Sequence, residues 1–71
     1  MHLFSDGEVV YDLKAGEMRM RCRFYGDDGF TLYCGGVPTI KWSSLVDAVE
    51  YYKMMVLTGD WEIVKAAPCV E

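Results

Sequence analysis

Polar and apolar side chains alternate without a break from Glu17 to Tyr25. A period of two over this length predicts a β-strand with one buried face. The segment Gly26-Asp27-Asp28-Gly29 that follows has the composition of a turn, and an apolar face resumes within residues 30–34. The stretch from Glu17 to Cys34 therefore predicts a β-hairpin around which the rest of the chain is organised.

The length of the hairpin loop follows from the rule that directly opposed residues share a face. A two-residue loop would oppose Phe24 to Thr31, an apolar to a polar side chain. A three-residue loop, Asp27-Asp28-Gly29, opposes Phe24 to Leu32 and Cys22 to Cys34, and glycine suits the left-handed third position of such a loop. We therefore expect the three-residue loop.

Two further strands are expected before this hairpin. Residues 1–4 are apolar and precede a turn signal, Ser5-Asp6-Gly7, and residues 8–14 alternate again. Strands over 1–4, 8–14, 17–26 and 30–34 then form an antiparallel meander.

The connection between the second and third of these strands is expected at Ala15-Gly16. This two-residue turn opposes Tyr11 to Met20 and sets Asp12 against Arg19, an opposite-charge pair. Alanine is a poor residue for the first position of such a turn, which requires a positive φ.

The second half of the chain predicts one helix between two extended segments. Residues 37–42 contain Pro38 and are extended, either as a short edge strand or as a crossing segment. Ser44 and Asp47 have the spacing of a capping box, which predicts a helix over residues 44–58 that ends at Gly59. Residues 60–66 predict a last strand. Six apolar helical residues fall on one face: Leu45, Ala48, Val49, Tyr52, Met55 and Val56.

The expected fold is therefore α+β. An antiparallel meander of four to five strands carries one helix on its apolar face, and residues 1–71 form a single domain. A chain of 71 residues buries only about 60% of its unfolded surface. Because 52% of the residues are hydrophobic, either nearly every apolar residue is used in the core or some of them cover a partner or a second copy of the chain.

The composition also bears on the compartment. No apolar run approaches the length of a membrane span, and the first six residues lack the basic start and long apolar core of a signal peptide. The three cysteines have no disulfide-framework spacing, which fits a reducing compartment. We therefore expect a cytoplasmic location.

No motif for catalysis, a cofactor or a metal occurs in the sequence. His2 has no plausible nucleophile beside it, and no glycine-rich phosphate loop opens the helix. A zinc site from His2, Cys22, Cys34 and Cys69 would lack any pair at close spacing. We expect no enzymatic activity, no cofactor and no metal.

Charge patterning leaves two candidate binding surfaces. The formal net charge of −4 disfavours simple binding to phosphates or to an anionic membrane and favours a basic partner. Because the loops of a meander alternate between the two ends of the sheet, the acidic loops share one end, and the last strand joins them if the helix runs towards that end. This acidic patch would consist of Asp6, Glu8, Asp27, Asp28, Asp60 and Glu62.

The second candidate surface is the polar face of the hairpin. Arginine and aromatic side chains on a sheet are typical of surfaces that stack bases and hold phosphates. Neighbouring acids such as Asp12 would partly neutralise the arginines, so we expect a basic protein partner before direct nucleic-acid binding. This arginine–tyrosine face consists of Arg19, Arg21, Arg23, Tyr25, Thr31 and Tyr33.

In its size, acidity, aromatic content and lack of motifs, the chain resembles the small phage and mobile-element inhibitors of bacterial defence, notably anti-CRISPR proteins. The resemblance covers the overall character of the whole chain and no motif. It implies a stoichiometric inhibitor, some members of that group being DNA mimics that block nucleic-acid binding by a CRISPR-Cas effector complex in the bacterial cytoplasm. The alternatives are a small regulator or nucleic-acid-binding module that uses the arginine–tyrosine face, and a homodimeric interaction module.

Overall fold

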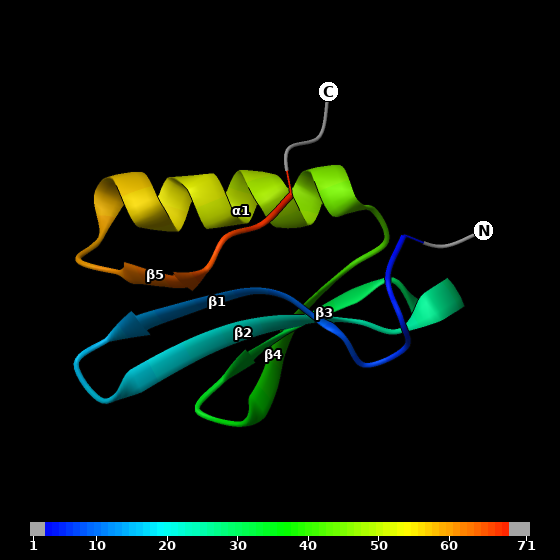
Figure 1. The fold of residues 1–71 in the computed structure, drawn as a ribbon, viewed down its shortest axis with the longest axis horizontal. Helices are drawn as coiled ribbons and strands as arrows, with labels where there is room; N and C mark the ends of the chain where they lie inside the picture. The colour runs from blue at the N-terminus through cyan, green and yellow to red at the C-terminus, as the bar shows by residue number, and fades with distance from the viewer. Residues whose placement is uncertain (1–2, 69–71) are drawn as a thin grey trace.

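A computed structural model describes residues 3–68 of the chain as one antiparallel sheet and one helix (Figure 1). The strand order is β4-β3-β2-β1-β5, so sequential strands from β1 to β4 are neighbours and the last strand returns to the edge beside β1. The α+β meander with one helix is confirmed. The elements are β1 (Val9–Ala15), β2 (Met18–Phe24), the short 3-10 turn η1 (Gly26–Asp28), β3 (Phe30–Cys34), β4 (Val37–Trp42), α1 (Leu45–Thr58) and β5 (Glu62–Lys65).

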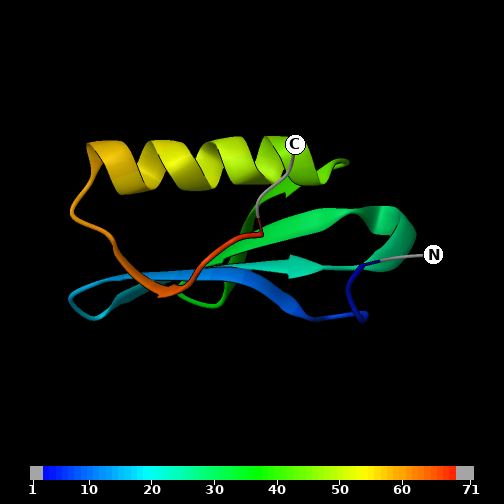
Figure 2. The ribbon, with the colours of Figure 1, turned by 45° about the horizontal axis from the view of Figure 1, so that its top comes forward.

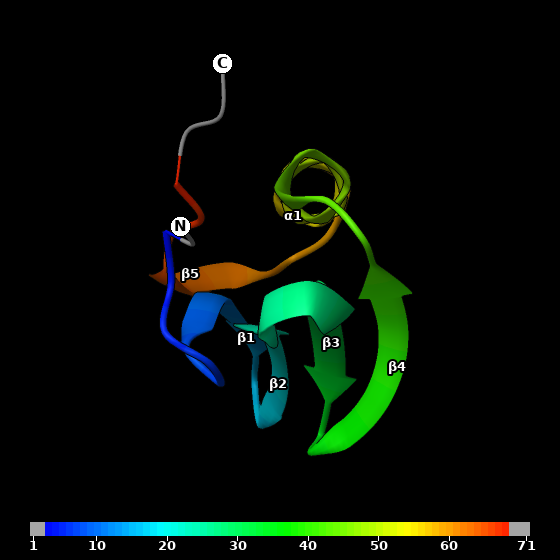
Figure 3. The same ribbon diagram turned by 90° about the vertical axis from the view of Figure 1, so that its right-hand side faces the viewer.

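The sheet curls around one side of α1. Figure 2 shows the helix lying along the sheet, and Figure 3 shows it over the open side between β4 and β5. Tyr11, Leu13 and Leu32 are fully buried between these layers, with Ala48 and Val49 of α1 above them. Burial of these side chains is the main force that holds the helix on the sheet.

The hairpin of β2 and β3 forms, but the predicted register is wrong. Phe24 opposes Phe30, and Cys22 opposes Leu32 instead of Cys34. The loop has five residues, because η1 fills it with its own backbone hydrogen bonds, and Tyr25 N donates to Gly29 O at 2.8 Å to close it. The difference is two positions along the partner strand, so the same side chains face the core, and alternation alone could not distinguish the two registers.

The turn between β1 and β2 also differs from the prediction. It consists of residues 16 and 17, and Gly16 takes the positive φ of 62° at its first position. Tyr11 consequently opposes Cys22, and Asp12 opposes Arg21. The predicted Ala15-Gly16 turn is wrong because alanine does not readily adopt the left-handed conformation that glycine adopts there.

Three expectations about the edges of the sheet have different outcomes. The predicted first strand is wrong over residues 3–4, which form a bend, while residues 1–2 lie outside the described part. Residues 37–42 are a true edge strand, β4, paired with β3. The last strand is confirmed as β5, shorter than expected and paired with β1.

The helix begins and ends where its caps predict. Asp47 N donates to Ser44 Oγ at 3.3 Å, and Ser44 Oγ donates to Asp47 Oδ2 at 3.1 Å. At the other end Gly59 N donates to Met55 O at 3.0 Å. The predicted apolar face of α1 packs on the sheet. Within residues 3–68 no helix has the length and apolar character needed to cross a bilayer.

Candidate functional site

Four of the six acidic residues predicted to cluster lie at one end of the sheet. Asp6 lies in the turn before β1 and Glu8 follows it, while Asp27 and Asp28 lie in η1. Backbone hydrogen bonds tie the first segment to the end of β2, two residues before η1, since Gly7 N donates to the carbonyl of residue 24 at 2.6 Å and the amide of residue 24 donates to Glu8 O at 2.9 Å. We call these four residues the acidic end.

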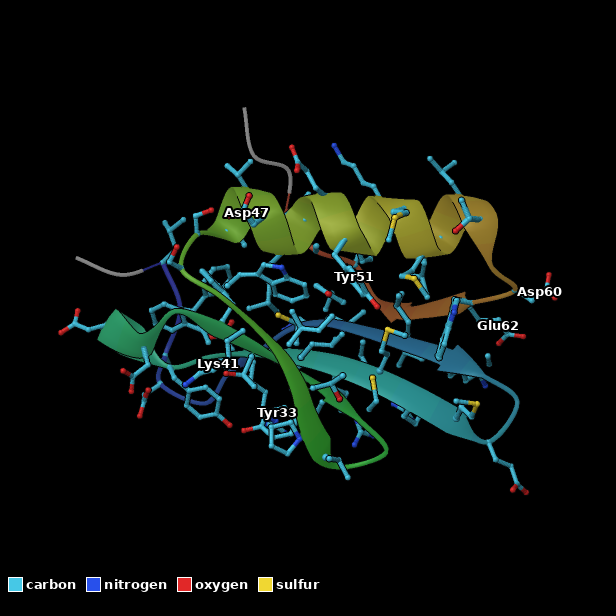
Figure 4. The ribbon with its side chains drawn as sticks, turned by 180° about the vertical axis from the view of Figure 1, so that it is seen from behind. Tyr33, Lys41, Asp47, Tyr51, Asp60 and Glu62 are labelled. Atoms are coloured by element: carbon cyan, nitrogen blue, oxygen red, sulfur yellow. The ribbon has the colours of Figure 1, made fainter. Side chains whose placement is uncertain are left out.

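Asp60 and Glu62 lie at the opposite end of the sheet, so the predicted six-residue patch is wrong for these two (Figure 4). The helix starts near η1, because β4 ends there with Trp42 opposite Phe30. It then runs away from the acidic end. Glu62 instead opposes Lys14 beside the turn of β1 and β2, with Glu62 Oε2 at 3.6 Å from Lys14 Nζ.

The arginine–tyrosine face is assembled by the register of three strands. Arg21 stands between Asp12 on β1 and Tyr33 on β3, and Arg23 opposes Thr31, which in turn opposes Lys41 on β4. Figure 4 shows Tyr33 and Lys41 on the side of the sheet turned away from α1. By strand register, six of the seven lysine and arginine residues occupy positions of this outer face: Lys14, Arg19, Arg21, Arg23, Lys41 and Lys65.

One buried carboxylate joins two of the arginines. Asp12 is 7% exposed, and it accepts hydrogen bonds from Arg19 Nε at 3.2 Å and Nη2 at 2.5 Å and from Arg21 Nε at 3.2 Å. Burial opposes ionisation of Asp12, but the hydrogen bonds from Arg19 and then Arg21 outweigh it and hold the pKa of this carboxyl below its usual value. Asp12 is therefore ionised at neutral pH and shared between two guanidinium groups.

Single hydrogen bonds hold Arg23 and the two tyrosines of this face. Arg23 Nη1 donates to Gly7 O at 2.7 Å. The hydroxyls of Tyr25 and Tyr33 lie 2.8 Å apart, with their ring centroids separated by 6.4 Å. The hydrogen bond to Tyr33, with some burial, raises the pKa of Tyr25 above its usual value. Tyr25 thus stays neutral at physiological pH.

Two hollows lie on either side of this tyrosine pair. The first, the arginine hollow, has a volume of about 250 Å³, and the second, the tyrosine–proline hollow, about 440 Å³. Tyr25 and Tyr33 line both of them and so separate them. The arginine hollow is further lined by Arg19, Arg21, Arg23 and Gly36, and the tyrosine–proline hollow by Asp28, Thr31, Pro38 and Lys41.

Sequence reasoning found the tyrosines and arginines but missed the second hollow. Its extra residues are Asp28, Pro38 and Lys41, and Asp28 had been assigned only to the acidic patch. Lys41 and Pro38 reach this face because β4 pairs with β3. The pairing of residues 37–42 was left open, so no signal in the sequence placed these side chains beside Tyr33.

Residues 3–68 contain no group of three or more histidine, cysteine or acidic side chains that could hold a metal. Two members of the zinc set considered above, His2 and Cys69, lie outside that range. Burial raises the pKa of the Cys22 thiol to about 12, so this thiol is protonated and unreactive at neutral pH.

The chain matches no family model, no curated protein and no solved structure.

Proposed function

We propose that this domain is a binding protein without catalytic activity, and that its arginine–tyrosine face binds an anionic partner. The observation that carries the proposal is the segregation of charge, with six of the seven cationic residues at positions of one face of the sheet. Lys14 is paired with Glu62, and Asp12 neutralises one of the charges of Arg19 and Arg21. The three arginines therefore retain an excess of two positive charges.

The net charge of −4 does not prevent this binding, because most of the acids of the described residues lie away from this face, whereas Asp12, Asp28 and Glu62 lie on it or at its border. The molecule extends 35 × 27 × 17 Å, and charges further apart than about 8 Å are largely screened at physiological ionic strength. The electrostatic potential that acts on an anion at the centre of the outer face is consequently determined mainly by the nearby arginines. The acids of the helix and those beyond the sheet ends have a weaker effect.

The test uses inorganic polyphosphate, which supplies a row of phosphate charges and no other recognition element. We expect it to bind with an affinity that falls as salt rises, because binding releases counterions. Arg21→Gln and Arg23→Gln should each weaken binding several-fold. Lys53→Gln removes the same charge from the exposed surface of α1 and should leave binding unchanged. Equal binding by all four proteins, or none by the wild type at low salt, would overturn the proposal.

A second candidate function uses the acidic end, as the resemblance to anti-CRISPR inhibitors implies. It is favoured by the backbone hydrogen bonds that fix residues 7 and 8 to the end of β2, just before η1, since a fixed set of carboxylates is what a nucleic-acid mimic presents to a basic groove. Such an inhibitor would block nucleic-acid binding by a basic effector complex. Its partner would be recovered from nuclease-treated bacterial lysate by the wild type and lost with the double variant Asp27→Lys/Asp28→Lys.

Either function would operate in the cytoplasm. The free thiols of Cys22 and Cys34 are compatible with a reducing compartment, where buried cysteines act as small apolar side chains.

A further inference from the structure

The two hollows of the outer face differ in chemistry although they share a wall. The arginine hollow is lined by three guanidinium groups, whereas the tyrosine–proline hollow combines flat apolar surfaces with one carboxylate and one amine. A ligand that fills both must carry negative charge at one end and a flat group with polar edges at the other. We propose that this ligand is a nucleotide unit of a single-stranded nucleic acid, an inference that rests on the proposed function.

The phosphate fits the arginine hollow. Alternate residues of a strand are separated by roughly 7 Å, so Arg19, Arg21 and Arg23 form a row of cations along β2. Asp12 occupies two N–H donors of Arg19 and one of Arg21, and Arg23 uses one donor on Gly7 O. The remaining N–H groups are available for phosphate oxygens, which arginine binds in a bidentate manner.

The base fits the tyrosine–proline hollow. Tyr33 and Pro38 are directly opposed across β3 and β4 and provide an apolar surface for stacking. Asp28 lies at one side of this hollow, and a carboxylate there accepts hydrogen bonds from the amino group of a base. Lys41 supplies a donor for a ring nitrogen or a carbonyl oxygen. Binding of a base would account for the presence of an acid and a lysine beside the two tyrosines.

The hydroxyl pair of Tyr25 and Tyr33 fixes the wall between the hollows. Because each hydroxyl bonds the other at 2.8 Å, both rings are ordered before a ligand arrives. The phosphate and the base of one nucleotide unit would lie on opposite sides of this wall. A base inside a duplex is stacked and paired, so it cannot enter the hollow, and single strands should bind in preference to duplexes.

An extended acidic peptide is the main competing ligand. Its carboxylates could follow the same row of arginines, but it carries no flat group for the tyrosine–proline hollow. The two ligands therefore differ in whether the residues of the second hollow contribute to binding.

The experiment measures fluorescence anisotropy with four probes of equal charge: single-stranded RNA, single-stranded DNA, polyphosphate and oligoglutamate. Tyr33→Ala should weaken binding of either single strand by about ten-fold, a typical loss for one stacked base, and leave polyphosphate binding within two-fold. Lys41→Gln, at an exposed position of the edge strand, should weaken the single strands by a few-fold without affecting the fold. Arg23→Gln should weaken all four probes.

Tyr33→Phe is the matched control, because it keeps the ring and removes only the hydroxyl. It should bind single strands nearly as well as the wild type, and its thermal unfolding shows whether loss of the hydroxyl bond disturbs the face. Competition by nucleoside monophosphates distinguishes a free nucleotide from a strand as the source of the unit. If nucleoside monophosphate displaces the single-stranded probe at the same nucleotide concentration, the natural ligand is a free nucleotide. If a large excess of monophosphate is needed for displacement, the natural ligand is a strand.

The failure of this inference is distinguishable from that of the proposed function. If polyphosphate, oligoglutamate and single strands bind alike, and neither Tyr33→Ala nor Lys41→Gln discriminates among them, the nucleotide inference is wrong while anion binding stands. If none of the four probes binds at low salt, the proposed function fails as well. Tighter binding of duplex than of single-stranded DNA would also overturn the inference.

Discussion

Replacement of Asp12 by asparagine should lower the stability of the fold and yet strengthen its binding to anions. Asp12 is 7% exposed and accepts hydrogen bonds from two arginines, whose side chains are 36% and 42% exposed. A hydrogen bond to a charged group contributes about 1.5–3 kcal/mol when buried. Exposed ion pairs contribute about 1 kcal/mol or less. For a buried acid with half-exposed partners we expect a loss of about 1–2 kcal/mol in the free energy of unfolding.

The lowered pKa of Asp12 determines how the stability difference between wild type and Asp12→Asn changes with pH. The pKa of Asp12 is lower in the folded state than in the unfolded chain, so the unfolded state takes up the proton first as the pH falls. The stabilisation is therefore present above the usual aspartate pKa of about 3.9 and disappears as the pH falls through the folded value. Urea denaturation should show a clear difference between wild type and Asp12→Asn at pH 7, and a smaller one below pH 4.

The same substitution changes the charge of the outer face by one unit. It releases Arg19 and Arg21 from their shared carboxylate, so polyphosphate should bind a few-fold more tightly at low salt. The slope of log affinity against log salt should steepen by up to about 0.7, the value for one further phosphate contact on a single strand. If Asp12→Asn keeps its fold and binds polyphosphate more weakly, Asp12 positions the arginines for the ligand and our reasoning about competition is wrong.

Three further predictions concern the fold. Leu32→Ala, at a fully buried position, should lower the free energy of unfolding by about 3 kcal/mol, whereas Leu57→Ala, at a position 84% exposed, should change it by less than about 0.5 kcal/mol. Gly29→Ala should be strongly destabilising, because φ is +80° and the new Cβ would clash with backbone at the end of β4. Gly35→Ala has a φ of +59° but open space, and should lower stability by only about 1–2 kcal/mol. Ser44→Ala should lower stability by about 1 kcal/mol through loss of the helix cap.

Chemical denaturation of the purified variants measures the change in the free energy of unfolding for all three predictions. Equal losses for Leu32→Ala and Leu57→Ala would contradict the position of the core. Equal losses for the two glycine variants would contradict the close approach of the η1 loop to β4. An unchanged stability of Ser44→Ala would mean that the cap hydrogen bond does not contribute in solution.

Local patterns were sufficient for most elements of this fold, although the strand expected from residue 1 is wrong over residues 3–4 and the pairing of residues 37–42 was left open. The alternation in residues 17–25 predicted β2, because the side chains of a strand point to alternate faces whatever the strand pairs with. The spacing of Ser44, Asp47 and Gly59 located the helix within one residue of its observed bounds, because a cap is a local hydrogen-bonding requirement. Which side chains of β2, β3 and α1 face the core was predictable for the same reason, whereas in β1 a bulge between Val9 and Tyr11 buries Val10, which alternation had placed on the outer face.

The register was not predictable from those patterns. A shift of two positions keeps every apolar side chain on the same face, so the choice depended on turn conformation. At the first turn, the positive φ of Gly16 at the first turn position determined the register of β1 and β2. The sequence had indicated this arrangement, because Ala15 fits that position poorly. At the second turn the closed 3-10 conformation of residues 26–28 decided it, and no residue of that loop distinguished five positions from three.

By itself, then, the sequence determined strands β1, β2, β3 and β5, the helix, the core-facing side chains of β2, β3 and α1, and the two groups of charge that are candidates for binding. Only the tertiary structure decided how the charges are grouped. Because α1 starts at the acidic end and runs away from it, Asp60 and Glu62 lie at the opposite end of the sheet. Because β4 pairs with β3, Lys41 and Pro38 lie beside Tyr33, and the outer face gains its second hollow. Pairing between distant segments depends on the packing of the whole core, which no local pattern contains.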